Sequence, residues 1–294
     1  MRISVVLPTA RLGGMDVLFS CLNLQIFSRD DWELVLIDHW YDLRAPIIMK
    51  AAQAFGINVQ HVPAPASTIY NNSSCWNAGL RCCRGELICF MVDFMWVPPD
   101  YLADHWRFYE QNGFTMTGYL DRYAPPQLKS ECTIKELAWS VFDQEFNAER
   151  AAAYFANNQP EYRERKGGVV GPLHPSGYRM MPWHLVYMIP DSVPLEILKQ
   201  VNGWDQRFNG MYGSNDINLA YRCELFGHKF LLNPVSISQK LGTPKSSALL
   251  PAKSGAFEKT GTPEDAYALH LKIKERIDMG QETYAVPDRF GAWR

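Results

Sequence analysis

The segment Gly85–Leu102, GELICFMVDFMWVPPDYL, decides the fold of this chain. Its apolar run from Leu87 to Val92 is continuous rather than alternating, which is typical of a strand buried on both faces in a parallel sheet. The run ends at Asp93, and Asp100 then precedes a predicted helix. An acid at the carboxyl end of such a strand lies where open α/β sheets bind ligands. An Asp there can also simply cap the next turn, so the rest of the sequence must decide between the two interpretations.

Three strand–helix pairs precede this segment. Strands are predicted at residues 3–7, 33–37 and 57–62, and helices at residues 17–27, 48–55 and 71–85. Right-handed crossovers then give a mainly parallel, twisted α/β sheet flanked by helices. Strands one, two and four end at Pro8–Thr9, Asp38 and Asp93, which we expect at one edge of the sheet. This edge suits a nucleotide, although no GxGxxG follows the first strand and no P-loop motif occurs.

The composition excludes several other classes of protein. A chain of 294 residues with a net charge of −2 has no global field to attract nucleic acid or an anionic membrane. The seven cysteines have no metal-type spacing, and we expect reduced, mostly buried thiols. The sequence enters a strand at once and has no long apolar stretch, so we expect a cytoplasmic protein without integral membrane association.

The first hundred residues resemble family-2 glycosyltransferases of the GT-A fold. The resemblance is carried by Pro-Thr after strand one, ELVLID, the spacing NxGxxxxxGE, and an acid before PPDYL. It implies a GT-A-like fold, in which a Rossmann-like half binds the nucleotide of a nucleotide-diphospho-sugar donor. Trp76 replaces the usual Arg before the Asn-x-Gly, and His39 replaces a second acid after strand two. The predicted nucleotide-binding residues are Pro8, Thr9, Arg11, Asp38, Asn77 and Asp93.

The metal motif of that family is incomplete in this chain. The family carries Asp-x-Asp at the end of strand four, whereas only Asp93 is present here. Diphosphate and water can complete the shell of Mn²⁺ or Mg²⁺ around one carboxylate, so Asp93 is also the predicted metal ligand. Alternatively, a Lys or Arg could neutralise the leaving diphosphate instead.

A second signature of the same family follows in residues 186–240. Gly203-Trp204-Asp205 with Phe208 matches its Gly-(aromatic)-Asp-x-x-Phe segment, and Gly213–Asp216 matches Gly-Gly-Glu-Asp at the start of a helix. Asp191 or Ser192 is expected to cap the preceding helix. Arg222 holds the position of a family arginine two turns into the second helix.

The resemblance implies that Asp216 is the catalytic base and that the anomeric carbon is inverted. A carboxylate can take the proton of an attacking alcohol, and Asn215 can hydrogen-bond that alcohol but cannot deprotonate it. An acid in the first turn can alternatively serve only to complement the helix dipole. Trp204 and Tyr212 are the predicted acceptor-binding residues, by stacking on a sugar, and each could equally belong to the core.

The remaining segments give weaker signals. Residues 133–157 are predicted to be helical, and a basic stretch with the loop 167–171 follows; residues 242–261 are read as a loop. A terminal helix is predicted over 264–279 with Ala268, Leu271 and Ile277 on its apolar side, followed by a polar tail. We therefore expect a catalytic domain over 1–240, with a nucleotide half over 1–105 and an acceptor half over 186–240, and an extension over 241–294.

The sequence thus predicts a glycosyltransferase that moves a sugar from a nucleotide-diphosphate donor to a hydroxyl of a glycan, lipid carrier, protein or modified nucleobase. A nucleotidyltransferase is the first alternative, but the stretch from Ala10 to Gly14 provides only a weak basic glycine-rich loop. A degenerate transferase that binds nucleotide or glycan without turnover is the second, favoured by the missing second metal Asp and by Asn215 in place of Glu.

Overall fold

The computed structural model describes residues 1–10, 15–93, 95–113, 115–121, 175–176, 178–186, 188, 191–240 and 258–293. The first half contains β1 (Ile3–Thr9), α1 (Met15–Asn23), η1 (Arg29–Asp31), β2 (Trp32–Asp38), α2 (Tyr41–Phe55), β3 (Val59–Pro63), α3 (Asn72–Cys82), β4 (Leu87–Phe90), β5 (Met95–Trp96), α4 (Tyr101–Asn112) and β6 (Thr115–Asp121). The second half contains β7 (Arg179–Met181), η3 (Trp183–Leu185), β8 (Ser192–Pro194), α7 (Leu195–Gln200), η4 (Gln206–Phe208), α8 (Asn215–Leu225), β9 (Phe230–Lys240), α10 (Pro263–Asp278) and η5 (Asp288–Phe290).

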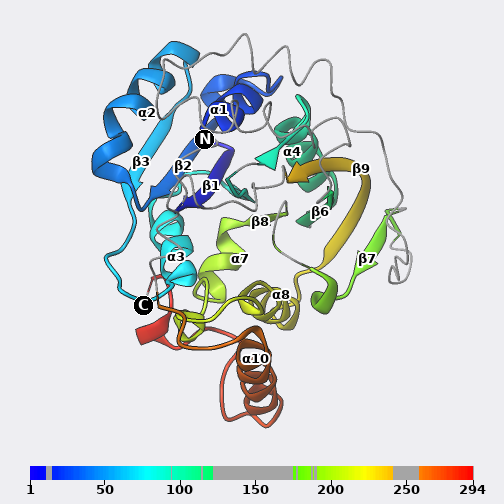
Figure 1. Cartoon of the computed structure of the whole chain (residues 1–294). Helices are drawn as coiled ribbons and strands as arrows, with labels where there is room; N and C mark the ends of the chain where they lie inside the picture. Colours follow the sequence, from blue (N-terminus) through cyan, green and yellow to red (C-terminus); the bar gives the residue numbers. More distant parts are fainter. Residues whose placement is uncertain are drawn as a thin grey trace.

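A five-stranded sheet of order β3-β2-β1-β4-β8 forms the centre of the molecule (Figure 1). The first four strands are parallel, as the sequence predicts, and β8 pairs antiparallel with β4. Register places Thr9 opposite Asp38, so the carboxyl ends of β1 and β2 meet at one edge. The predicted mainly parallel α/β fold is therefore confirmed.

The alternation of side chains along each strand divides the core into two layers. Ile3, Val5 and Leu7 of β1 point to the face covered by α1, α2 and α4, whereas Val6 points to the face covered by α3, α7 and α8. The same division holds along β2 and β4, which are buried throughout on both faces. This is why their sequences read as unbroken apolar runs.

A second, four-stranded unit lies beside the main sheet. Its order is β5-β9-β6, and β7 pairs with the amino end of β9. β9 is antiparallel to β5 and parallel to β6, with a register shift between Thr117 and Tyr119. Through β5, this unit is joined to the segment just after Asp93.

Two local predictions were wrong, and a third is not tested. Residues Ser192–Pro194 form β8 rather than a helix cap, and α7 begins only at Leu195 after the N-cap residue Pro194. Gly85 does not end α3, which stops at Cys82; a Cβ at Gly85 would lie 2.3 Å from the backbone nitrogen of Ser4, so this glycine permits close contact with β1. The predicted helix over 133–157 and the basic loop after it lie outside the described residues.

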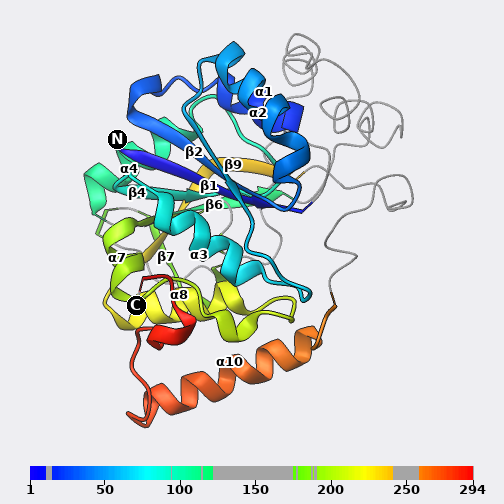
Figure 2. The same ribbon diagram turned by 90° about the vertical axis from the view of Figure 1, so that its left-hand side faces the viewer.

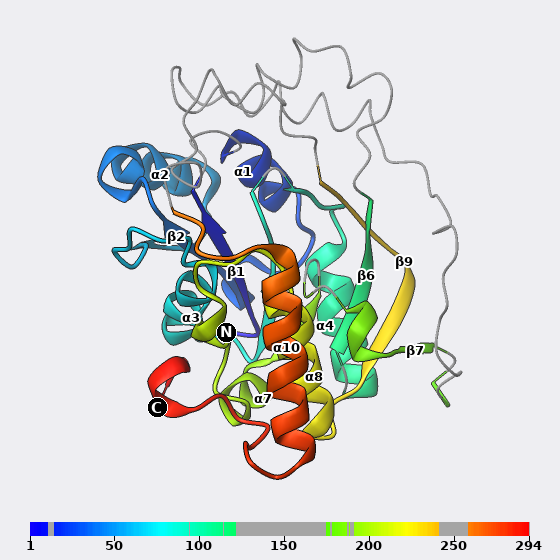
Figure 3. The ribbon, with the colours of Figure 1, turned by 60° about the horizontal axis from the view of Figure 1, so that its bottom comes forward.

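α10 and the segment after it pack against the acceptor half. α10 lies along α8 on the side away from the main sheet (Figures 2 and 3). Its buried side chains are Ala266, His270 and Ile273. Of the predicted apolar side, Ile277 packs against this group, whereas Ala268 and Leu271 are exposed, so the prediction was wrong for two of its three residues. The final segment returns across the structure, and Val286 and Ala292 are buried, so the predicted polar tail is partly core.

Candidate nucleotide and acceptor site

The carboxyl edge of the main sheet brings together two predicted site residues from different strands. Thr9, the last residue of β1, donates a hydrogen bond of 3.1 Å from its Oγ1 to Oδ2 of Asp93, which follows β4. Both side chains are almost fully buried, at 2% and 5% exposure, and Pro8 beside them is half-buried. The hydroxyl and the carboxylate therefore form a polar floor at the edge where the sequence predicts a nucleotide.

Asp38 lies at the same edge, but its carboxylate is already occupied. Oδ1 accepts from the backbone N–H of Trp40 at 2.7 Å and from Nη2 of Arg44 at 2.5 Å. Oδ2 accepts from Nε of Arg44 at 2.8 Å and lies 2.9 Å from Nε2 of His61. Burial raises the pKa of Asp38, but hydrogen bonds from His61 and Arg44 outweigh this and lower it.

These four contacts correct the predicted role of Asp38. A carboxylate offers about four acceptor positions, and all four are used here by the protein. The side chain is also only 1% exposed. Asp38 therefore fixes α2 against β2 and β3 through Arg44 and His61, and it does not present an acceptor to a nucleotide base. The sequence analysis missed Arg44. Its pairing with Asp38 can be seen only in the folded chain, where α2 packs against the end of β2.

Asn77 joins the two halves of the chain. Its Nδ2 donates to the carbonyl of Trp204 at 2.7 Å, and its Oδ1 accepts from the N–H of Trp204 at 2.8 Å. The side chain has no exposed surface, so the prediction that it binds a nucleotide is corrected. Its amide instead pairs with both backbone polar groups of Trp204, and this holds the Gly-Trp-Asp segment against α3.

Trp204 is a core residue, so its predicted stacking on a sugar was wrong. The ring is 1% exposed and stacks on Trp76 with a centroid distance of 5.3 Å and an interplanar angle of 14°. Phe90 of β4 meets both rings edge-on. Trp76 occupies the position where the family pattern has Arg, and its ring provides the stacking partner of Trp204.

Two glycines permit this close packing. A Cβ on Gly79 would lie 2.5 Å from Cδ1 of Ile37 and 2.7 Å from Cγ1 of Val6, so α3 can approach the sheet only with glycine at this position. Gly203 has a φ of 72° and faces Oδ1 of Asn77, which a Cβ would approach to 2.7 Å. The Asn-x-Gly and Gly-Trp-Asp motifs are thus two sides of one contact.

Further links continue from this contact toward the amino end of α8. Ser74 and Asn209 exchange two hydrogen bonds, and the N–H of Gly210 donates to the carbonyl of Tyr70. The carbonyl of Gly210 accepts in turn from the N–H of Thr260. Because α3 begins at the carboxyl edge of the sheet, these contacts hold residues 209–214 at the same edge, directly before α8.

The turn into α8 is strained. Gly213 has a φ of 93°, and Ser214, the N-cap residue, has a φ of 59° without a side-chain cap bond. A left-handed conformation at a non-glycine residue costs about 1–2 kcal/mol and is uncommon; Met188 and Asn202 also adopt it. Asn215 and Asp216 then form the first turn of α8; both are half-buried, and Oδ1 of Asp216 accepts from the N–H of Ile217 at 2.9 Å.

Tyr212 is accessible, in contrast to Trp204. It is 57% exposed and lies two residues before the strained turn. Its ring lies 6.3 Å from that of Tyr70, and Nζ of Lys259 lies 5.7 Å from its centroid. The sequence analysis missed Tyr70 and Lys259, because only the pairing of Ile69 with Glu258 brings these segments together.

The described cysteines are free thiols, and the described residues contain no preformed metal cluster. Six free cysteines are described, of which four are buried, and burial raises the pKa of Cys75 beside His39 to about 12. Within the described ranges, no three His, Cys, Asp or Glu side chains cluster closely enough to hold a metal ion. Arg11 lies outside the described residues.

This chain resembles known proteins in its structure rather than in its sequence. No protein-family model matches the chain, and its sequence matches no curated protein. S. aureus TarS 1-349 in complex with UDP-GlcNAc superimposes with a TM-score of 0.58 at 14% identity, over 95% of this chain and 67% of that chain. GalNAc-T7 with UDP, GalNAc and Mn²⁺ gives a TM-score of 0.55 at 11% identity, over 93% of this chain and 48% of that chain. The chain has a GT-A-like fold.

The GT-A-like fold also matches mannosyltransferase PcManGT from Pyrobaculum calidifontis in complex with GDP-Man and Mn²⁺. That match has a TM-score of 0.50 at 14% identity and covers 97% of this chain and 66% of that chain. The chain spans 61% of the TarS structure that contains UDP. Within its own described part, no helix is both long and apolar enough to cross a membrane.

Proposed function

We propose that this chain transfers a sugar from a nucleotide-diphosphate donor to an acceptor hydroxyl, with Asp216 as general base and with inversion at the anomeric carbon. The observation that carries the proposal is the pair of hydrogen bonds between Asn77 and the backbone of Trp204. It fixes the second motif to the helix beside the nucleotide edge. The proposal assigns residues 1–105 to the donor, residues 186–240 to the acceptor, and residues 241–294 to an extension.

On the donor side, the backbone at Pro8 and Thr9 and the floor formed by Thr9 and Asp93 would receive the nucleotide. Because Asp38 already accepts four contacts from the protein, the proposal gives it no direct role in base recognition. It would instead act indirectly, because Arg44 and His61 fix the strand end on which the base rests. Any selectivity for the base then comes from groups other than this carboxylate.

On the acceptor side, Asp216 would take the proton of the attacking hydroxyl. The oxygen must lose that proton as it bonds to the anomeric carbon, while the diphosphate departs with the electrons of the broken bond. The amino end of α8 favours the ionised form of a carboxylate in its first turn. Asn215 would orient the hydroxyl, and the exposed ring of Tyr212 would stack on the acceptor.

The donor set of this site suits a divalent cation only in part. Asp93 would supply one carboxylate to Mn²⁺ or Mg²⁺, and diphosphate and water would supply the remaining oxygen ligands. When bound, such an ion neutralises the charge that develops on the leaving diphosphate. The residues of this chain would meanwhile hold the donor and accept the proton.

The test is release of nucleoside diphosphate from a panel of nucleotide sugars, with and without Mn²⁺. Loss of a general base typically lowers kcat by about 10²–10⁴-fold, so Asp216→Asn should lose turnover to this extent and keep its affinity for UDP. Glu264→Gln, which removes a first-turn acid from α10, is the matched control and should leave turnover unchanged. Undiminished turnover in Asp216→Asn would rule out the proposed base.

Donor binding without turnover in the wild type would instead favour a recognition module. The single carboxylate at Asp93 is the observation that supports this second candidate, because it provides one metal ligand where the Asp-x-Asp pattern has two. Pyrophosphate release from a nucleoside triphosphate would identify a nucleotidyltransferase. Failure to bind any nucleotide or nucleotide sugar would exclude both enzymes and leave only a glycan-binding module.

A further inference from the structure

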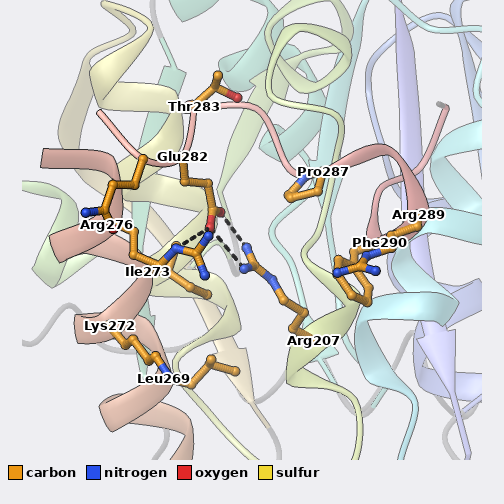
Figure 4. A pocket seen from close by; sticks show the side chains of 11 residues that line it. Arg207, Leu269, Lys272, Ile273, Arg276, Glu282, Thr283, Pro287, Arg289 and Phe290 are labelled. Carbon is orange, nitrogen blue, oxygen red and sulfur yellow. Dashed lines mark hydrogen bonds and ion pairs between the residues drawn. The ribbon is translucent and has the colours of Figure 1, made fainter. Parts of the chain in front are cut away.

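The carboxylate of Glu282, in the segment after α10, binds two arginines from other parts of the chain. Nη1 and Nη2 of Arg207 in η4 donate to it at 3.1 and 2.6 Å (Figure 4), and Nη2 of Arg222 in α8 donates to it at 2.7 Å. The side chain of Glu282 is 6% exposed, and that of Arg222 is not exposed at all. Burial raises the pKa of Glu282, but hydrogen bonds from both arginines outweigh this and lower it. An ionised carboxylate therefore joins η4 and α8 to the end of the chain.

Arg222 uses all the donors of its guanidinium group within the protein. A guanidinium group has five N–H donors. Its five acceptors, at 2.7–3.4 Å, are Oδ1 of Asn218, the carbonyls of Thr283 and Tyr284, and the carboxylates of Glu282 and Asp205. At this one side chain, α8 is thus attached both to the Gly-Trp-Asp segment and to the end of the chain.

The charges at this point balance. Oδ1 of Asp205 accepts from Nε of Arg207 at 2.9 Å, and Oδ2 accepts from its Nη2 at 2.5 Å, so two guanidinium groups share two carboxylates. Arg276 lies 3.8 Å from Glu282 but is half exposed to water. Removing one carboxylate from such a group is costly, because a charge that has left water then lacks its partner. Solvent cannot replace Glu282 at this position.

The segment that carries Glu282 is itself docked on the residue before the Gly-Trp-Asp segment. Oδ1 of Asn202 accepts from the N–H of Trp293 at 2.9 Å, and its Nδ2 donates to the carbonyl of Val286 at 3.0 Å. The carbonyl of Asn202 accepts from the N–H of Ala292 at 2.9 Å. The end of the chain is therefore built into this part of the fold, and Glu282 is held in place from both sides.

The contacts of Arg222 bear on the end of α8 that carries Asp216. Asp216 lies six residues earlier in the same helix, about 9 Å away at a rise of about 1.5 Å per residue. The turn before it is left-handed at Ser214 and has no side-chain cap bond, and such a turn persists only where the surrounding structure over-determines it. Residues 209–214 hold the amino end of α8, and Arg222 fixes the direction and rotation of the helix further along.

We propose that Glu282 is a positioning residue: by pairing with Arg207 and Arg222 it fixes α8, and through α8 it fixes the carboxylate of Asp216. Its effect on turnover rests on the proposed function, whereas its hold on α8 does not depend on any reaction. Glu282 touches no reacting atom in this scheme and acts only through the helix. A displacement of a reacting group by about 1 Å can cost on the order of 10²-fold in rate, so a small shift of α8 is enough.

The variant Glu282→Gln keeps the size of the side chain and removes its charge. With the nucleotide sugar that the wild type turns over fastest, and well below the thermal midpoint, its kcat should fall about tenfold or more while the Kd for UDP stays unchanged. If this variant does not fold, Glu282→Asp, which keeps the charge but draws it back by one methylene group, serves for the same comparison. An undiminished kcat would overturn the proposal, because the role of Glu282 would then be only structural.

The matched control is Glu33→Gln. Glu33 lies near the amino end of β2, its side chain has no exposed surface, and it accepts from Nε and Nη2 of Arg84 at 2.9 and 2.6 Å. The same change of carboxylate to amide there should lower the thermal midpoint and leave kcat unchanged. An equal loss of kcat in both variants would show a general effect of instability and contradict the proposal.

Amide hydrogen exchange in the same variants separates this proposal from the proposed function. Glu282→Gln should speed exchange in α8 from Asn218 onward by about tenfold or more, because local opening of the helix becomes easier, and should leave the amides of β1 unchanged. Glu33→Gln should leave α8 unchanged. A wild type without any turnover but with this exchange pattern would refute the transferase and retain the hold of Glu282 on α8. Unchanged exchange in α8 would overturn that hold even in an active enzyme.

Discussion

Replacing Asn77 with alanine tests whether this residue connects two halves of the protein or contacts the nucleotide. The change removes both hydrogen bonds to Trp204 and leaves a buried N–H and a buried carbonyl without partners. Each such group costs roughly 1–3 kcal/mol, so the expected loss in the free energy of unfolding is roughly 2–6 kcal/mol. This is a large share of the roughly 5–15 kcal/mol that stabilises a typical domain. Urea unfolding followed by tryptophan fluorescence measures it.

The control is Asn112→Ala, which removes one half-buried hydrogen bond to the carbonyl of Phe108 at the end of α4. It should cost no more than about 1 kcal/mol. Below the unfolding transition, Asn77→Ala should bind UDP with nearly the affinity of the wild type. A weakened UDP affinity together with an unchanged free energy of unfolding would refute the structural role and restore the nucleotide contact predicted from sequence.

Three further predictions follow from the geometry. Burial lowers the pKa of three histidines, to about 3 for His105 and about 4 for His228 and His270, so they are neutral in the folded protein. The unfolded pKa is about 6.5, so below that pH the unfolded state binds more protons than the folded state. Stability should therefore fall as the pH drops from about 6.5 to 4, by up to ~1.4 kcal/mol per pH unit for each histidine. The thermal midpoint should accordingly be lower at pH 5 than at pH 7. Gly79→Ala should cost about 1–3 kcal/mol in urea unfolding, since its Cβ overlaps two side chains of the sheet. Ser214→Gly should raise stability by up to about 1 kcal/mol, by removing a left-handed serine, and an unchanged thermal midpoint would show that the turn is not strained.

Much of the fold could be predicted because local pattern and tertiary environment agree in the central sheet. β1, β2 and β4 are continuous apolar runs because helices cover both of their faces. β8 could not be predicted in the same way. Ser192–Pro194 carries capping residues and a proline, and only the free edge of β4 makes it a strand. The apolar side of α10 was misjudged because Leu271 is exposed and His270 is buried.

The candidate site could be predicted by position but not by the contacts its residues make. Thr9 and Asp93 meet because parallel strands end together, which follows from topology alone. The occupation of Asp38 depends on Arg44 and His61, six and twenty-three positions later in the chain. No spacing rule links these residues, since their contact arises only when α2 and β3 have packed. Tyr212 is exposed and Trp204 is buried, and this difference too arises only when the helices have packed, so the sequence alone does not reveal it.

Trp76 and Ser214 both depart from the family pattern, and the structure accommodates them in different ways. Trp76 lies where the family pattern has an arginine, and its ring stacks on that of Trp204 in the core. Ser214 replaces a glycine and keeps the left-handed turn at an energetic cost. Such a turn persists only where the surrounding structure over-determines it. Because that turn lies directly before Asp216, it fixes where α8 begins and therefore where this carboxylate lies.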